Sequence, residues 1–539
     1  MPQSSPDKAI SRPPDFVLRL VDRIPADAAV VVYDGDDATI EDSFARINPT
    51  ARWLAWDRAG GLAPGTAGAV VLDRPLPAAP AAGAVIERAA RLLAPGGTLL
   101  VRCTNAEFHE TVASRLDGGT DSDPAAHVPE AVAPLVLGSG LSMASVIADH
   151  DDVAGARAFA QARQADLDRI GMTAVSRLTR LAGRSFLVVA LRGPLPPPMF
   201  INARLRDPTL GANAAMSEVR VERPLRFLAS YPNLVIRVER DPAPMSPPGR
   251  DRSIFIHQRP ILRRPWGLDL LRELRRRNYV VVLEFDDHPS FWPDIALHDY
   301  LTFAGPHAVQ TSTPALADVL RRYNPNVAVF RNDIAELPPP RPPRPGPVRV
   351  FYGSLNRAAS IEPLTEGINR VLRTAKVATA TAVILDREFF DRLETPRKSY
   401  SGMIDQARHR TLVSQADIVL LPLADTEFNR CKSDLSFIEA AARGAVVIAS
   451  PVVYGSSVVD GETGFLYRSP AEFEEKFDRL IHDTALRRRL AANAYAYVRR
   501  SRLLKDSFRE RYAWYQSLLD RKSELDAAAA ERVPELAAR

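Results

Sequence analysis

The stretch that decides the fold reads FNRCKSDLSFIEAAARGAVVIASPVVYG and covers residues 428–455. Its first half predicts a buried helix, because Leu435, Ile438 and Ala442 recur at helical spacing and Gly444 suits the position just past a helix end. Its second half, GAVVIAS, is a short apolar run typical of a buried strand. A helix that leads directly into such a strand is the repeating unit of a doubly wound parallel sheet.

One carboxylate interrupts the apolar surface of this predicted helix. A buried Glu439 costs several kcal/mol unless it is paired or hydrogen-bonded. It is either a structural Glu held by backbone N–H groups or an arginine, or a Glu that accepts hydrogen bonds from the hydroxyls of a bound ribose. Lys432, Ser433 and the free N–H groups of the helix start favour the second reading, because they form a natural site for a diphosphate.

The same alternation of strands and helices extends outward in both directions. On either side of the opening stretch, VRVFYG, TAVILD, ADIVLLPL and TGFLY predict strands of one α/β unit, and SIFIHQ, YVVVLEF, HAVQT and VAVF predict a second. Two proline-rich stretches, 192–200 and 336–350, predict stiff linkers. We therefore expect an α/β protein of three doubly wound, Rossmann-like units: residues 1–192, 199–336 and 348–520, followed by a flexible helical tail at 521–539.

Composition sets broad limits on function. The chain has 539 residues, a formal net charge of +5, 46% hydrophobic residues and 25% charged residues, which describes an ordinary globular protein and gives no sign of nucleic-acid binding. Two cysteines suggest a reducing compartment without a disulfide framework. The first residues, MPQSSPDKAISRPPDF, lack the apolar core of a signal peptide, and no stretch reaches the ~20 apolar residues of a membrane span. We expect a cytoplasmic protein, at most peripheral at the inner face of a membrane.

The opening stretch, with GETGFLY, FYGSLN and HAVQTSTPALADVL, resembles the GT-B glycosyltransferases of the family-4 type over about residues 200–520. The resemblance implies that Glu439 binds the nucleotide ribose and that Gly353 lies by the donor phosphates. The predicted donor-binding set is Gly353, Ser433, Glu439 and Gly455. That family usually carries a second Glu eight residues earlier, where this chain has Cys431, so Lys432 is expected to face the diphosphate instead.

A departing nucleoside diphosphate needs positive charge nearby, so Lys432 and Arg357 are the candidates for catalytic stabilisation. Asp287 and His257 are candidates for facing the acceptor, although His257 is equally compatible with a buried structural histidine. The segment EFDDHP, residues 284–289, could in principle bind a metal, but we expect it to line a cleft. We predict no metal site and no required cofactor.

The first unit resembles class I S-adenosylmethionine-dependent methyltransferases, best in LLAPGGTLLV, with Asp57 at the position of the family's ribose-binding acid. Its first turn, Asp34–Ala38, has one glycine and three carboxylates where that family has several glycines. A crowded, negative turn disfavours the cofactor. We expect a degenerate domain that serves as a scaffold and does not bind S-adenosylmethionine tightly.

The predicted function is sugar transfer from a nucleotide-diphosphate sugar to a glycan, lipid-linked saccharide or protein acceptor, in surface polysaccharide biosynthesis. The resemblance implies retention at the anomeric carbon. The basic stretch 263–279 is either a solvated helix face or a contact with anionic lipid. Three alternatives stay open: a bifunctional enzyme with an active methyltransferase domain, a non-catalytic carbohydrate-binding or assembly protein, and a sugar-nucleotide epimerase.

Overall fold

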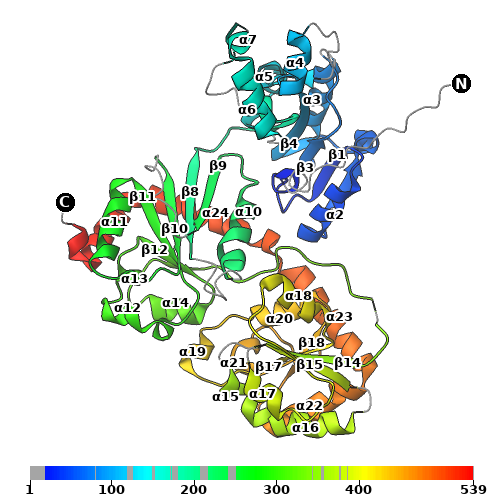
Figure 1. The fold of residues 1–539 in the computed structure, drawn as a ribbon, viewed down its shortest axis with the longest axis vertical. Helices are drawn as coiled ribbons and strands as arrows, with labels where there is room; N and C mark the ends of the chain where they lie inside the picture. The colour runs from blue at the N-terminus through cyan, green and yellow to red at the C-terminus, as the bar shows by residue number, and fades with distance from the viewer. Residues whose placement is uncertain are drawn as a thin grey trace, which may run out of the picture. The chain divides into compact units, whose positions relative to one another are not determined.

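The computed structural model describes residues 19–78, 81–117, 126–148, 152–169, 172, 180–206, 216–240, 251–342, 344–353, 357–375, 378–384 and 386–537. The N-terminal stretch quoted above and residues 354–356 of the FYGSLN motif lie outside these ranges. The chain divides into two compact units, Met1–Pro198 with Ala229–Leu234, and Met199–Leu228 with Val235–Arg539. Figure 1 shows one sheet in the first unit and two in the second.

The first unit is built on a seven-stranded sheet with the order β2-β1-β3-β4-β7-β6, to which β5 adds beside β4. The first four strands are parallel as predicted, whereas β7 runs antiparallel to both β4 and β6. Its strands are β1 (Val30–Asp34), β2 (Arg52–Ala55), β3 (Ala67–Leu72), β4 (Leu93–Asn105), β5 (Ala126–His127), β6 (Ser142–Ala148) and β7 (Ser185–Leu191). Its helices are α2 (Ala38–Ile47), η1 (Trp56–Gly61), α3 (Ala81–Leu92), α4 (His109–Leu116), α5 (Pro129–Gly138), α6 (Val153–Ala162) and α7 (Gln164–Arg169).

The first half of the second unit contains a six-stranded sheet with the order β13-β12-β11-β10-β8-β9. Its strands are β8 (Met199–Leu205), β9 (Leu234–Arg240), β10 (Ser253–Gln258), β11 (Tyr279–Glu284), β12 (Ala308–Thr311) and β13 (Val327–Val329). Its helices are η2 (Glu218–Glu222), α10 (Arg223–Leu228), α11 (Trp266–Arg276), η3 (Pro289–Phe291), α12 (Pro293–Leu297), α13 (Leu301–Ala304) and α14 (Pro314–Leu320).

The second half of this unit holds an all-parallel sheet with the order β16-β15-β14-β17-β18-β19. Its strands are β14 (Val348–Gly353), β15 (Ala378–Ile384), β16 (Ser399–Ser401), β17 (Ile418–Leu421), β18 (Val446–Ala449) and β19 (Phe465–Leu466). Its helices are α15 (Ala358–Ile361), η4 (Glu362–Leu364), α16 (Thr365–Thr374), α17 (Arg387–Arg392), α18 (Gln406–Gln415), α19 (Glu427–Arg430), α20 (Leu435–Ala442), α21 (Pro451–Tyr454), α22 (Pro470–His482) and α23 (Thr484–Ser501).

Alternate residues of β14 show how the second half buries both faces of its sheet. Val350 and Tyr352 pack into a core with α16 and α22, whereas Phe351 packs into a separate core with α20 and α23. Side chains on a strand point alternately to opposite faces, so helices must cover both. Two Rossmann-like halves of this kind in one unit form the GT-B architecture, and the predicted α/β fold class is confirmed.

The C-terminal segment returns to the first half of the unit, as the red helices of Figure 1 show. It contains η5 (Leu504–Asp506), α24 (Phe508–Asp520), α25 (Lys522–Arg532) and η6 (Pro534–Leu536). The hydroxyl of Tyr515 on α24 donates to Gln310 of β12 over 2.8 Å, and the ring of Phe508 lies 6.0 Å from that of Phe227.

The expectation of a flexible tail was wrong for the described residues of α25 and η6. Leu525, Ala529, Val533 and Leu536 are buried, the last three in one core with α11 and β11. Asp526 also pairs with the buried His307 over 3.0 Å. The apolar stripe was hard to see because alanines and charges surround it. Deletion after residue 521 should therefore lower the melting temperature of the whole unit.

Candidate functional site

The start of α20 is the centre of the predicted site. The helix follows β17, which ends at Leu421, and leads into β18, so it begins at the carboxyl-end edge of this parallel sheet. Ligands of open α/β sheets bind at this edge. Asp434 occupies the N-cap position but its side chain makes no capping hydrogen bond. The first N–H groups of α20 therefore donate no capping hydrogen bond to that carboxylate.

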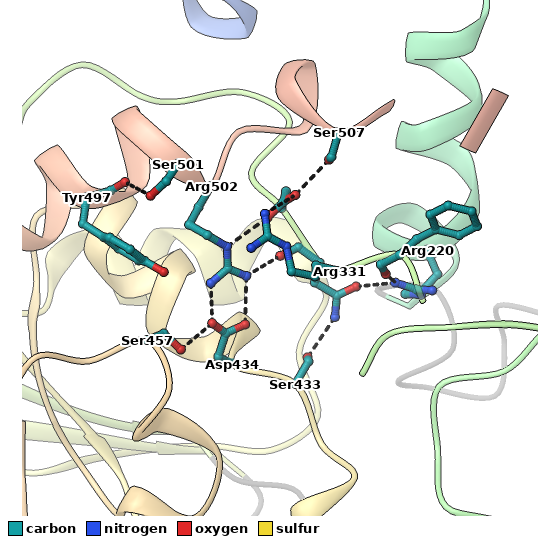
Figure 2. A network of polar contacts seen from close by, with 12 residues as sticks. Arg220, Arg331, Ser433, Asp434, Ser457, Tyr497, Ser501, Arg502 and Ser507 are labelled. Atoms are coloured by element: carbon teal, nitrogen blue, oxygen red, sulfur yellow. Dashed lines mark hydrogen bonds and ion pairs between the residues drawn. The ribbon is translucent and has the colours of Figure 1, made fainter. Parts of the chain in front are cut away.

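The carboxylate of Asp434 is instead held by an arginine from the C-terminal segment. The buried Arg502 pairs with both oxygens of Asp434, one over 2.9 Å, and its Nε donates to Asp333 over 3.0 Å. Ser457 donates to Asp434 over 2.6 Å and Ser507 donates to Asp333 over 2.9 Å (Figure 2). One guanidinium thus joins the start of α20, the connection after β13 and the residues that follow α23.

A second buried arginine extends this network into the first half. Arg220 donates to Glu284 at the end of β11 over 2.8 Å and to the side-chain oxygen of Asn332, also over 2.8 Å. The amide of Asn332 in turn donates to the hydroxyl of Ser433 over 2.8 Å (Figure 2). We call the set of Arg220, Glu284, Asn332, Asp333, Asp434 and Arg502 the paired network. It fixes the position of Ser433, directly before α20.

A different group of charges surrounds Lys432. Arg259, after β10, donates to Asp286 over 2.6 Å and lies 3.0 Å from Asp287, after β11. Arg357, which precedes α15, is close enough to influence Lys432 electrostatically. Three of the four predicted catalytic residues, Lys432, Arg357 and Asp287, therefore belong to one electrostatic group. We call this set of five residues the cationic cluster, because it contains three cations and two carboxylates.

Burial and neighbouring charges shift the pKa values of two residues in the cationic cluster. Burial and the neighbouring Arg357 lower the pKa of Lys432, and the carboxylates only partly oppose this. Burial raises the pKa of Asp287, although Arg259 acts in the opposite direction. Arg259 also has a φ of 47°, an unusual conformation for a residue with a side chain. A partly desolvated cluster with one surplus positive charge is suited to bind a polyanion such as a diphosphate.

Glu439 is buried as predicted, with 5% of its surface exposed. Its Oε1 accepts a hydrogen bond from the side-chain amide of Gln406, the first residue of α18, over 3.3 Å. It also raises the pKa values of His409 and Arg443, which burial lowers overall. The carboxylate of Glu439 therefore has neighbours of the kind expected for a structural role. It accepts one long hydrogen bond, so its oxygens can still accept further hydrogen bonds from a ligand.

The remaining predicted residues lie at different places. Gly353 ends β14 at the same sheet edge, and Gly455 follows α21, where an added Cβ would lie 2.7 Å from the carbonyl oxygen of Pro451. His257, on β10, lines a pocket of about 460 Å³ together with Arg204 and Arg259. Burial and Arg204 lower the pKa of His257 to about 3, so its imidazole is neutral near pH 7 and is a weak base.

Cys431 stands where the resembling family has a Glu. It is buried among Leu283, Phe285 and other apolar residues of the first half, and its backbone oxygen accepts a hydrogen bond from Thr313 over 2.9 Å. Burial raises the pKa of its thiol. The residue therefore anchors the segment before α20 to the first half.

Sequence reasoning missed Arg259, Asn332 and Arg502. Arg259 directly follows a predicted strand, a position that could have drawn attention to it. Nothing local marks the other two, because their partners lie far away in the chain.

The basic stretch 263–279 forms α11 and its flanks. Arg272 and Arg275 bind residues of the C-terminal segment, and Arg276 and Arg277 pair with Glu273. These contacts favour a paired helix face over a lipid contact, although Trp266 is 75% exposed. Within the described ranges no helix combines the length and apolarity of a membrane span, and no three His, Cys, Asp or Glu side chains form a group able to hold a metal.

Residues 362–509 match a family described as glycosyl transferase-like. This segment includes α20 and most of the second half of the unit. No curated protein sequence matches the chain.

Several solved structures are similar at low identity. A variant of TarM from S. aureus, crystallised with fondaparinux, alpha-GlcNAc-glycerol and UDP, is 14% identical, with a TM-score of 0.38 over 49% of this chain and 55% of that one. A glycosyltransferase from Rickettsia africae is 13% identical, with a TM-score of 0.42 over 60% of this chain and 99% of that one. HepE from Anabaena, crystallised with UDP and glucose, is 15% identical, with a TM-score of 0.42 over 59% and 99%. The chain thus spans about half the length of TarM.

Proposed function

We propose that the second unit is a glycosyltransferase that moves a sugar from a nucleotide-diphosphate sugar to a glycan, lipid-linked saccharide or protein acceptor. The observation that carries the proposal is the cationic cluster at the carboxyl-end edge of the sheet, beside the start of α20. The match of residues 362–509 to the glycosyl transferase-like family supports it. TarM and HepE were crystallised with UDP, which makes a uridine nucleotide the first donor to test.

In the proposed reaction, the diphosphate lies between the start of α20 and the side chains of Lys432 and Arg357. These cations stabilise the negative charge that develops on the leaving diphosphate. Glu439 accepts hydrogen bonds from the ribose hydroxyls, and Ser433, Gly353 and the Gly455 turn surround the phosphates. We propose retention at the anomeric carbon, a cytoplasmic reaction in surface polysaccharide biosynthesis and no resident cofactor.

We propose that the acceptor approaches from the first half, past Asp287. His257 is a neutral hydrogen-bonding group in this scheme, because its low pKa makes it unsuitable as a general base near pH 7. The four-part domain division also remains a proposal, with the tail corrected as described above.

The first unit serves in this proposal as a scaffold without S-adenosylmethionine. The turn after β1 is occupied by the side chain of Tyr33, whose hydroxyl donates to Asp73 over 2.9 Å and would lie 2.3 Å from a Cβ added at Gly35. Arg74 pairs with Asp34 and Asp36 at the same turn. The turn that would face the cofactor is therefore filled by side chains of the protein itself.

A binding screen on the full-length protein tests these proposals. UDP, GDP, ADP, dTDP, their sugar derivatives and S-adenosylmethionine are compared by melting temperature and calorimetry. Native-state binding at a hundredfold excess over Kd adds about 2.7 kcal/mol of stability, which is easily detected. We expect one nucleotide series to bind and S-adenosylmethionine to have no effect.

Two further outcomes separate the alternatives. Binding of no nucleotide would support a carbohydrate-binding or assembly protein, and micromolar binding of S-adenosylmethionine would support a bifunctional enzyme. Incubation of the preferred sugar nucleotide without acceptor, followed by chromatography of the sugar, distinguishes an epimerase, which would convert it, from a transferase.

A further inference from the structure

Another pocket lies at the amino ends of the strands in the sheet of the second half, the sheet that contains β14, β17 and β18. It has a volume of about 650 Å³, within the range of small-molecule sites. Val348, at the start of β14, Asp417, directly before β17, and Gly444, two residues before β18, all line it. These residues mark the amino ends of the strands, whereas the proposed donor site lies at their carboxyl ends. The two sites are therefore separate.

The proline-rich connection forms one wall of this pocket. Arg341 anchors it, because its guanidinium donates to the backbone oxygen of Ala416 over 2.6 Å and to Asp417 over 2.8 Å. Tyr495 donates to the backbone oxygen of Pro338 over 2.9 Å. Prolines have a fixed φ and a stiff extended backbone, so a wall anchored in this way resists collapse onto the sheet.

One face of α23 forms the opposite wall. Thr484, Arg487, Arg488, Ala491, Ala492, Tyr495 and Arg499 line the pocket at spacings that place them on one side of the helix. Two alanines lie in the middle of this face, where larger side chains would fill the space. The prolines, the alanines and Tyr495 give the pocket a mainly apolar lining.

The charged groups of the pocket are mostly arginines. The one carboxylate in the lining, Asp417, is already used by Arg341 and by the backbone N–H of Arg349 over 2.9 Å. Arg344 and Arg488 are exposed. Within the part of the chain that the structure describes, neither guanidinium group forms a hydrogen bond or ion pair. The pocket thus offers an apolar interior beside two guanidinium groups that no carboxylate of the lining neutralises.

We propose that this pocket binds an organic phosphate with an apolar body. The phosphate contacts Arg344 and Arg488, because guanidinium groups bind phosphate through paired, charge-assisted hydrogen bonds. The apolar body lies against Ala491, Ala492 and the prolines. A phosphorylated alkyl chain and a phosphorylated aromatic compound both have this chemistry.

Calorimetry on the full-length protein with n-octyl phosphate, phenyl phosphate and inorganic phosphate tests the proposal. We expect an organic phosphate to bind at least tenfold more tightly than inorganic phosphate, with the preferred ester identifying an alkyl or an aryl body. Equal affinity for inorganic phosphate, or no binding of either ester, would overturn the proposal.

Two variants with matched controls locate the binding site. Arg344→Glu with Arg488→Glu should weaken ester binding at least tenfold, whereas Arg489→Glu with Arg500→Glu changes the same charge on exposed residues outside the pocket and should not. Ala492→Phe should block the pocket, whereas Ala485→Phe on the same helix should not. All six substituted residues are exposed, so melting temperatures should stay close to that of the unmodified protein.

Nucleotide affinity measured on the same variants separates this proposal from the proposed function. The pocket variants should keep any nucleotide binding, and Lys432→Ala should keep ester binding. Ester binding that survives both pocket variants and is lost in Lys432→Ala would place the ester at the donor site and overturn the inference.

Discussion

The paired network and the cationic cluster come close in sequence at Glu284 and Asp286 and again at Lys432 and Asp434, but their balance of charge differs. In the paired network, Arg502 has two carboxylate partners and a carbonyl partner, and Arg220 meets Glu284 and Asn332. In the cationic cluster, two carboxylates face three cations, and Lys432 lies beside Arg357. A buried charge that is fully paired supports the fold, whereas surplus charge costs stability and remains available for a ligand.

The largest expected effect comes from breaking the paired network. Arg502→Met removes the guanidinium and leaves the carboxylates of Asp333 and Asp434 without their main partner. Loss of one member of a buried pair costs about 3–5 kcal/mol. Denaturant unfolding of the variant should show this loss, and Arg500→Met, an exposed site two residues earlier, should unfold like the unmodified protein. Equal stability of the two variants would mean that the network contributes little.

Removing a cation from the cationic cluster should lower turnover without lowering stability. Lys432→Ala relieves the repulsion with Arg357, so the melting temperature should stay the same or rise. Turnover should fall by roughly 10²–10³-fold, the usual effect of losing one group that stabilises a developing charge. Arg430→Ala, at an exposed arginine close by, is the control. A variant that turns over normally but unfolds early would assign Lys432 to the structure.

A smaller effect is expected for His257, which lines the neighbouring pocket as a neutral group. Its folded pKa of about 3 lies below its unfolded value near 6.5, so between these values the unfolded chain binds more protons. The unmodified protein should therefore lose stability as the pH falls below 6.5, and His257→Gln should escape this loss. The difference should be about 2 kcal/mol at pH 5 and near zero at pH 7.5. Parallel unfolding curves at both pH values would contradict the assigned burial.

The sequence was informative where neighbouring residues carry the signal. Helical spacing around Glu439 placed α20 and predicted the burial of its carboxylate. The antiparallel orientation of β7 was not predicted, because the apolar pattern of a strand does not indicate whether it runs parallel or antiparallel to its neighbours. The packed tail was missed because its apolar stripe is short and rich in alanine.

The paired network could not be predicted from the sequence, because its interacting members lie far apart in the chain. Arg502 and Asp434 are 68 residues apart, and Arg220 and Asn332 are separated by 112. Each is an ordinary polar residue in its local context, and only the folded chain brings them together. Pairing between distant charges is set by the tertiary fold, which local periodicity does not report.

Nucleotide affinity of the Glu439→Gln variant tests whether α20 binds a nucleotide through Glu439. Gln keeps the shape and one acceptor oxygen but loses the charge that strengthens hydrogen bonds to ribose hydroxyls, a loss of about 1.5–3 kcal/mol. We expect nucleotide affinity to fall roughly 10- to 150-fold while the variant melts at the same temperature as the unmodified protein. Unchanged affinity together with a lower melting temperature would show that Glu439 is a structural partner of Gln406 and Arg443 and does not bind the nucleotide.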